Sequence, residues 1–177
     1  MGHSRRGDRR GVLFAAVAAG TLAWLCAWPA HALEAPTGNV ILTITGNLIQ
    51  TNDNGAASFD LALLQTLPQH SFSTTTPWYP QPRKFAGVLL RDLLAAVGAP
   101  GSSTLRAAAL NDYRVDIPGE DATRHGAMLA YLLDDKPMSV REKGPLVIIY
   151  PFDAQPELRN AVNYSRAIWQ LRSLDLR

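Results

Sequence analysis

Aromatic and cationic side chains gather in the parts of this sequence that are rich in turn residues. They are Trp78, Tyr79, Tyr113, Arg114, Arg141, Lys143, Tyr164, Arg166 and Trp169. Aromatic faces stack on a planar ligand, and polar groups fix the position of its edge. Arginine can stack on the same ring or hold an acidic group through two parallel hydrogen bonds. These residues therefore indicate a binding site for a planar organic molecule.

The same residues also have a plainer interpretation, in which the tryptophans belong to the core and the arginines to the surface. Trp169 lies in a strand-like run with one apolar face, which suits a core position as well as a ligand site. Trp78 stands between Pro77 and Pro80, so a loop or pocket wall is the better interpretation there.

Common catalytic sequence motifs are missing from the sequence. It has no glycine-rich phosphate loop and no G-x-S-x-G segment. After residue 32 the only histidines are His70 and His125, which lack metal-ligand spacing and would be the only bases for a serine nucleophile. Asp134 and Asp135 indicate a solvated turn rather than an acid–base pair. We expect neither a metal site nor a catalytic residue.

The first 32 residues follow the plan of a secretory signal peptide. Four arginines among the first ten residues precede an apolar run over 11–28, and Ala30-His31-Ala32 fits a cleavage site. We expect the mature chain to begin at Leu33, and the alternative is a retained transmembrane anchor. The general and twin-arginine export routes both stay open. Cys26, the only cysteine, lies in the apolar run, so the mature chain would carry no thiol.

Residues 33–177 have the length of one ordinary domain with a sizeable core. The full chain has 17 Lys and Arg against 15 Asp and Glu, and residues 1–32 hold four of the first and one of the second. The remainder, 13 against 14, has a net charge of −1. Nucleic-acid binding requires a clustered basic face, so we expect no nucleic-acid partner.

Short strands are the main prediction from the apolar pattern. Strand-like runs are found at residues 40–49, 69–76, 105–110, 113–117 and 146–150. Residues 127–133 fit a helix or a strand. Residues 78–83 contain two prolines and are predicted to be irregular.

Helices are predicted to be few and short. Residues 58–66 fit a helix capped by Ser58, and residues 89–97 fit one that ends at Gly98. Residues 161–176 have mixed helix and strand character, and residues 50–57 contain an Asn-Gly turn. The pattern predicts an α+β domain with mixed sheets.

Three segments in order resemble the molybdopterin-binding domain of the sulfite oxidase superfamily. They are residues 85–94 (FAGVLLRDLL), residues 109–118 (ALNDYRVDIP) and residues 144–151 (GPLVIIYP). The resemblance spans nearly all of residues 33–177. It implies a sulfite-oxidase-like mixed β-sheet domain with a few short helices and a pterin site at one edge.

The sequence departs from the catalytic members of this superfamily at the metal ligand. They bind molybdenum through a cysteine, and the corresponding position here falls near Ser73-Thr74-Thr75. A hydroxyl cannot replace a thiolate as a soft ligand. The resemblance therefore implies a pterin, either reduced or molybdopterin-like, without a metal, and leaves enzymatic activity uncertain.

A subgroup of small exported proteins without the cysteine resembles the chain more closely, and shares the W-Q-L run at residues 169–171. Some members are periplasmic regulators that bind a reduced pterin and act on the periplasmic region of a membrane cyclic-di-GMP enzyme. The resemblance implies a periplasmic sensor with such a partner. The expected ligand contacts are Thr74, Thr75, Trp78, Asn111, Tyr113, Arg141, Tyr164, Arg166 and Trp169. The alternatives are an oxidoreductase subunit with a non-cysteine metal site, and an interaction module that has lost its pocket.

Overall fold

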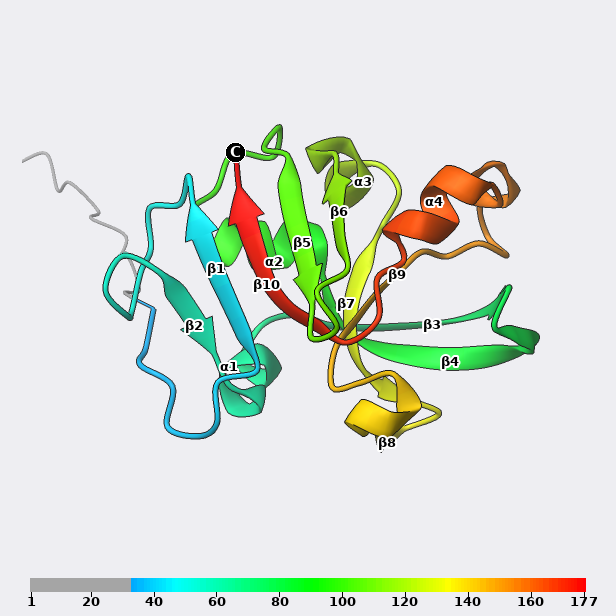
Figure 1. Cartoon of the computed structure of the whole chain (residues 1–177), viewed down its shortest axis with the longest axis horizontal. Helices are drawn as coiled ribbons and strands as arrows, with labels where there is room; N and C mark the ends of the chain where they lie inside the picture. The colour runs from blue at the N-terminus through cyan, green and yellow to red at the C-terminus, as the bar shows by residue number, and fades with distance from the viewer. Residues whose placement is uncertain (1–32) are drawn as a thin grey trace, which may run out of the picture. The chain divides into compact units, whose positions relative to one another are not determined.

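The computed structural model describes residues 33–177, which form two β-sheets and several short helices (Figure 1). The predicted signal peptide, with Cys26, lies outside the described residues. The first sheet has the order β2-β1-β10-β5-β6. Its strands are β1 (Leu42–Gly46), β2 (Ala57–Phe59), β5 (Leu105–Ala109), β6 (Arg114–Ile117) and β10 (Leu171–Leu176). β1 and β10 are parallel, and the other neighbours are antiparallel, so the sheet is mixed.

The second sheet is antiparallel and has the order β3-β4-β7-β8, with β9 also paired to β7. Its strands are β3 (Gln69–Thr76), β4 (Tyr79–Leu89), β7 (Met128–Leu133), β8 (Lys136–Pro137) and β9 (Val147–Ile149). The β3–β4 hairpin extends away from the first sheet and runs below α4 (Ala161–Arg166) in Figure 1. The region between them is where the candidate site is found.

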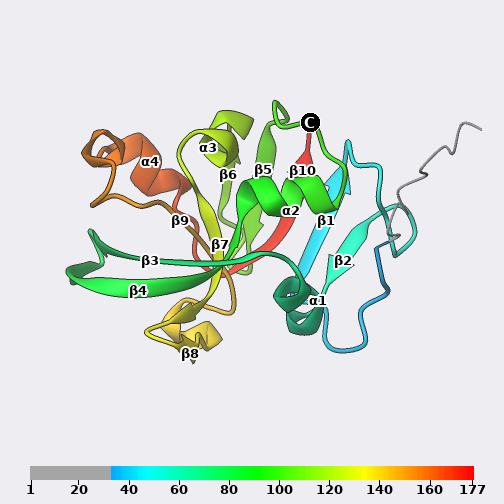
Figure 2. The ribbon, with the colours of Figure 1, turned by 180° about the vertical axis from the view of Figure 1, so that it is seen from behind.

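The remaining helices connect the strands. They are α1 (Leu61–Thr66), α2 (Leu90–Ala96), α3 (Gly119–Thr123) and the 3-10 turns η1 (Val140–Glu142) and η2 (Pro156–Leu158). α2 lies against one face of the first sheet (Figure 2) and buries Leu90, Leu93 and Leu94. Gly98 follows α2 with a φ of +63°, as its predicted role at the end of this helix requires. One mixed sheet and one antiparallel sheet, joined by a few short helices, confirm the predicted α+β class.

One continuous core joins the two sheets and the helices. Its largest fully buried side chains include Phe59 from the first sheet, Phe85 from the second, and Tyr150 and Phe152 after β9. Burying each of these aromatic side chains contributes about 2–3 kcal/mol of hydrophobic free energy. This core makes the strands a fixed frame for the loops that they carry.

Residues 78–83 were predicted to be irregular, which holds only for Trp78 in the turn, because residues 79–83 begin the long strand β4. β4 pairs with β7 only from Phe85 onward, so the first residues of β4 have one unpaired edge. The β3–β4 register shifts between Thr74 and Thr76, opposite Pro80 and Pro82. Proline is tolerated at a bulge or on an unpaired edge because no donor is needed there.

The predicted cap of the first helix was also wrong. Ser58 lies in β2, and the side chain of Asp60 accepts a 2.8 Å hydrogen bond from the N–H of Leu63 to cap α1. The ambiguous residues 127–133 form the strand β7. Among residues 33–177, no helix is long and apolar enough to cross a membrane.

Candidate ligand-binding pocket

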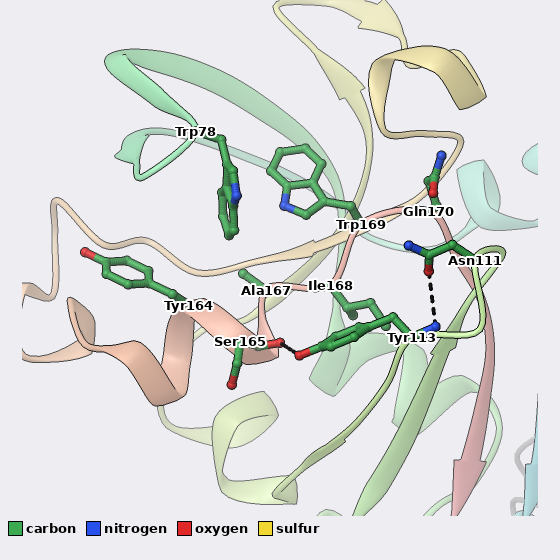
Figure 3. A pocket seen from close by; sticks show the side chains of 9 residues that line it. All are labelled: Trp78, Asn111, Tyr113, Tyr164, Ser165, Ala167, Ile168, Trp169 and Gln170. Atoms are coloured by element: carbon green, nitrogen blue, oxygen red, sulfur yellow. Dashed lines mark hydrogen bonds between the residues drawn. The ribbon is translucent and has the colours of Figure 1, made fainter.

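Three segments far apart in the sequence meet at a cavity of about 270 Å³. They are the turn between β3 and β4, the turn between β5 and β6, and the end of α4 with the loop that leads to β10. The lining residues are Trp78, Asn111, Tyr113, Tyr164, Ser165, Ala167, Ile168, Trp169 and Gln170 (Figure 3). Five of the nine predicted contact residues are among them: Trp78, Asn111, Tyr113, Tyr164 and Trp169. Their binding of a ligand stays a prediction.

Trp78 is positioned by the turn between β3 and β4. The hydroxyl of Thr76 accepts hydrogen bonds from the N–H groups of Trp78 (3.2 Å) and Tyr79 (2.9 Å). Thr76 is itself buried, so this anchor is fixed within the hairpin. Trp78 remains 36% exposed and can offer a ring to a ligand that enters from solvent.

Tyr113 connects the β5–β6 turn to α4. Its hydroxyl donates a 2.9 Å hydrogen bond to the carbonyl oxygen of Ser165, and its N–H donates to the side-chain oxygen of Asn111 at 3.1 Å (Figure 3). Asp112, between them, has a φ of +64°, a conformation that Asp and Asn tolerate in turns. The hydrogen bond from Tyr113 to Ser165 holds the β5–β6 turn and α4, which form two walls of the pocket, at a fixed separation.

Trp169 lies at the centre of an aromatic cluster. Its ring centroid is 5.2 Å from that of Trp78 and 5.9 Å from that of Tyr79, both nearly edge to face. Phe85 is 6.4 Å away, and the Lys143 ammonium lies over the indole ring at 5.6 Å. The indole Nε1 is buried, and no residue among 33–177 accepts a hydrogen bond from it.

Gln170 holds the loop that carries Trp169. Its N–H donates to the carbonyl oxygen of Lys143 and its carbonyl oxygen accepts from Leu110, both at 2.9 Å. Its side-chain amide donates to the carbonyl oxygen of Val140 at 2.8 Å. A φ of +54° at this non-glycine residue is uncommon. These bonds offset its cost and keep the loop in place.

Thr74 and Thr75 lie outside this pocket, on β3. The Thr74 hydroxyl accepts from the N–H of Asp153 at 3.1 Å, and Thr75 donates to the Asp153 carboxylate through its N–H (2.8 Å) and hydroxyl (2.6 Å). Burial alone would raise the pKa of Asp153, but the bonds from Thr75 and the guanidinium of Arg159 outweigh burial and lower this pKa. The two threonines thus fasten β3 to the loop after β9.

Arg166 and Arg141 also lie outside the pocket. The guanidinium of Arg166 is 3.2 Å from the carboxylate of Asp121, which is 3% exposed. Arg141 is exposed on η1. Predicting from sequence missed Ser165, Ala167, Ile168 and Gln170. Their positions next to Tyr164 and Trp169 were the only signal that could have found them.

The sequence matches a known protein-family model. The model described as the oxidoreductase molybdopterin binding domain matches residues 42–153, more than half of the chain. The chain belongs to this family. Trp78, Asn111 and Tyr113 lie within the matched residues, whereas residues 164–170 of the pocket lie beyond them.

A solved structure confirms the predicted sulfite-oxidase-like fold. The crystal structure of the sulfane dehydrogenase SoxCD from Paracoccus pantotrophus aligns with a TM-score of 0.56 and 17% sequence identity, over 76% of this chain and 37% of the SoxCD chain. At this identity the likeness concerns the fold alone, and the chain spans little more than a third of the length of that protein. The comparison with curated protein sequences found no match.

The pocket residues fit one part of the family's cofactor and not the other. A pterin is a planar heterocycle, and aromatic rings line the cavity, including that of Trp169, whose indole N–H is buried and unpaired. The resemblance implies a thiolate as the molybdenum ligand, and Cys26 is the only cysteine in the chain. Within residues 33–177, no three His, Cys, Asp or Glu side chains are grouped to hold a metal ion. The residues of the described domain therefore fit a pterin ring but not a thiolate-bound molybdenum.

Proposed function

We propose that this protein is a periplasmic pterin-binding sensor that regulates a membrane cyclic-di-GMP enzyme and does not carry out molybdenum redox catalysis. The observation that carries the proposal is the aromatic pocket of Trp78, Tyr113, Tyr164 and Trp169, in a member of a molybdopterin-binding family whose thiolate ligand is missing here. Export rests on the predicted signal peptide at residues 1–32.

The size of the cavity supports a single ring system. At about 270 Å³ it lies just below the roughly 300–1,000 Å³ that is usual for drug-sized ligands. A bicyclic pterin suits this volume better than the complete metal-bearing cofactor does. None of the lining residues is charged, so the pocket offers rings, amides and backbone groups rather than a phosphate clamp.

The way the pocket is assembled supports a regulatory role. Its walls come from the β3–β4 turn, the β5–β6 turn and the loop after α4, so a ligand that touches all three restricts their relative motion. A partner that contacts the rim would then distinguish bound from free protein. Regulation requires only that the partner has a different affinity for the two states. The exposed side chains of Trp78 and Tyr113 stand at that rim.

The first test is a titration with a dihydropterin and a tetrahydropterin, followed by tryptophan fluorescence. Trp78 and Trp169 are the only tryptophans after residue 32, so the exported protein reports on this pocket alone. We expect saturable quenching. Trp78→Ala should weaken binding about five- to tenfold, because aromatic stacking contributes roughly 0.5–1.5 kcal/mol beyond burial.

Leu61→Ala is the matched control. Leu61 is 37% exposed, close to the 36% of Trp78, and lies on α1 away from the pocket. The Leu61→Ala protein should bind the pterin with the affinity of the wild type. Saturable binding that Trp78→Ala leaves unchanged would place the ligand elsewhere, and no binding of either pterin would remove the proposed function.

The family's redox chemistry leads to the second candidate, an oxidoreductase subunit with a non-cysteine metal site. Membership in the oxidoreductase molybdopterin binding domain family is the observation that favours it. Elemental analysis of the exported protein decides between the two. Molybdenum near one atom per chain would support the second candidate, and its absence from a pterin-bearing protein would support the sensor.

A further inference from the structure

We infer that Trp169 recognises its ligand by donating a hydrogen bond from the indole N–H, not by offering a stacking face. This inference rests on the proposed function and names the residue that selects the ligand. It also specifies the chemistry that the ligand must present, which is a neutral hydrogen-bond acceptor such as a carbonyl oxygen or ring nitrogen in the plane of a heterocycle.

The indole nitrogen is the unusual atom of this pocket. Buried donors in proteins are nearly always paired, because an unmade hydrogen bond leaves their desolvation cost uncompensated. Trp169 Nε1 is the one buried side-chain nitrogen or oxygen without a partner in the part of the chain that the structure describes. Figure 3 shows this nitrogen on the edge of the ring that faces Trp78 and Ala167. Because this nitrogen is shielded from solvent, a ligand acceptor that pairs with it and removes the cost must first displace a neighbour that covers this edge.

The surroundings of Trp169 leave little of its face for stacking. The Lys143 ammonium lies over the ring, and the rings of Trp78, Tyr79 and Phe85 surround it at 5.2–6.4 Å. The backbone of Trp169 forms a β-bridge to Val147, which fixes the residue. A ring held in this way is a rigid support for a donor. Trp78, which is more exposed and lies on a turn, is the better stacking surface.

The uncharged lining of the pocket favours a neutral acceptor atom on the ligand over an anionic one. None of the residues that line the pocket is charged, and the nearby Arg166 and Arg172 pair with Asp121 and Asp112. The Lys143 ammonium lies over the Trp169 ring but is not part of the lining. An anionic ligand atom would therefore meet a neutral indole N–H in a pocket without a lining cation. A neutral acceptor loses less solvation on entering such a site.

Nuclear magnetic resonance of the exported protein, labelled with a nitrogen isotope, tests the inference directly. The full chain is expressed, and the mass of the purified form shows whether residues 1–32 were removed. A form that begins at Leu33 gives two indole N–H signals, assigned by loss of one in Trp169→Phe and of the other in Trp78→Phe. On addition of dihydropterin, the Trp169 signal should move downfield and its proton should exchange more slowly with water.

The affinity of Trp169→Phe gives the second measurement. Phenylalanine keeps an aromatic ring in the cluster but removes the donor and part of the ring area, so the dihydropterin should bind about tenfold more weakly, as the loss of one hydrogen bond implies. Leu61→Ala, the control, changes an exposed residue of α1 away from the pocket and should bind dihydropterin as the wild type does.

The outcomes separate the two proposals. Wild-type protein that binds dihydropterin while the Trp169 signal stays in place, or while Trp169→Phe binds within twofold, overturns the donor role and leaves the proposed function standing. Wild-type protein that binds no pterin overturns both. Should Trp169→Phe fail to fold, the wild-type spectrum alone decides, with the assignment taken from Trp78→Phe.

Discussion

The ion pair between Arg166 and Asp121 lies beside the pocket and fixes the end of α4. The Asp121 carboxylate also accepts a 2.7 Å hydrogen bond from the Tyr150 hydroxyl. Burial, followed by the charge of Asp121, raises the pKa of Tyr150, so this phenol keeps its proton and donates to Asp121 at neutral pH. The next four residues after Arg166 line the pocket. Their position therefore depends on a carboxylate that lies outside the pocket.

We expect Arg166→Met to lower the free energy of unfolding by about 2–3 kcal/mol. Removing one partner of a buried pair costs roughly 3–5 kcal/mol, and the remaining bond from Tyr150 and the partial exposure of Arg166 reduce that figure. Urea denaturation measures the change. Arg172→Met is the control, because its partner Asp112 is 75% exposed in the side chain and such surface pairs contribute about 1 kcal/mol or less. Equal losses in the two variants would contradict the structural role of Arg166.

Individual side chains were predicted from sequence where local context determines their place. Trp78, Asn111 and Tyr113 lie in or beside turns that proline, asparagine and aspartate mark, and they reach the pocket. Arg166 was expected at the ligand because arginine often binds there. Its partner Asp121 is 45 residues away in the sequence, and no local pattern indicates such a pair. The prediction therefore could not separate a ligand contact from an ion pair.

The β4 strand shows how an element can depend on a single glycine. At Gly87 the β4–β7 register shifts, and a Cβ atom would collide with the carbonyl oxygen of Leu129 and lie 2.8 Å from the Cα atom of Ala130. Both neighbours are backbone atoms of β7, so they cannot move aside without breaking the pairing. β4 continues into the hairpin that carries Trp78, which makes this contact important for the pocket.

We expect Gly87→Ala to destabilise the protein by about 2 kcal/mol or more, as overpacking against backbone usually does. Thermal or urea unfolding measures the effect. Gly101→Ala is the control, since the nearest atom to its added Cβ is a side-chain methyl of Thr123 at 3.3 Å, and a change within about 0.5 kcal/mol is expected there. A stable Gly87→Ala protein with the wild-type spectrum would show that the two strands can separate to admit the methyl group.

Elements with a clear local pattern, either polar alternation or an apolar run, were predicted well, and those determined by pairing were not. Residues 69–76 form β3 as predicted, and the residues around α2 and β9 match their patterns within a few positions. β4 begins with two prolines because one of its edges is unpaired, which becomes visible only when the partner strands are known. Asp60 rather than Ser58 caps α1 because β2 extends through Ser58.

At the scale of the whole domain, the pocket exists because two sheets bring three distant segments together. The sequence contains the aromatic residues but not their separation, so it indicates a planar ligand without fixing the cavity. Family membership adds a pterin as the ligand class to test. Because the thiolate is missing, the proposed function assigns the same pocket to binding rather than to redox chemistry.

Mass spectrometry of the small molecules released from the exported protein, purified from the compartment in which it accumulates, tests this account most directly. The account predicts a pterin in an amount near one per chain, without molybdenum. Trp78→Ala protein, prepared in parallel, should release less of it. A protein that releases molybdopterin together with one molybdenum atom per chain, or that releases no pterin and takes up none when it is supplied, would contradict the account.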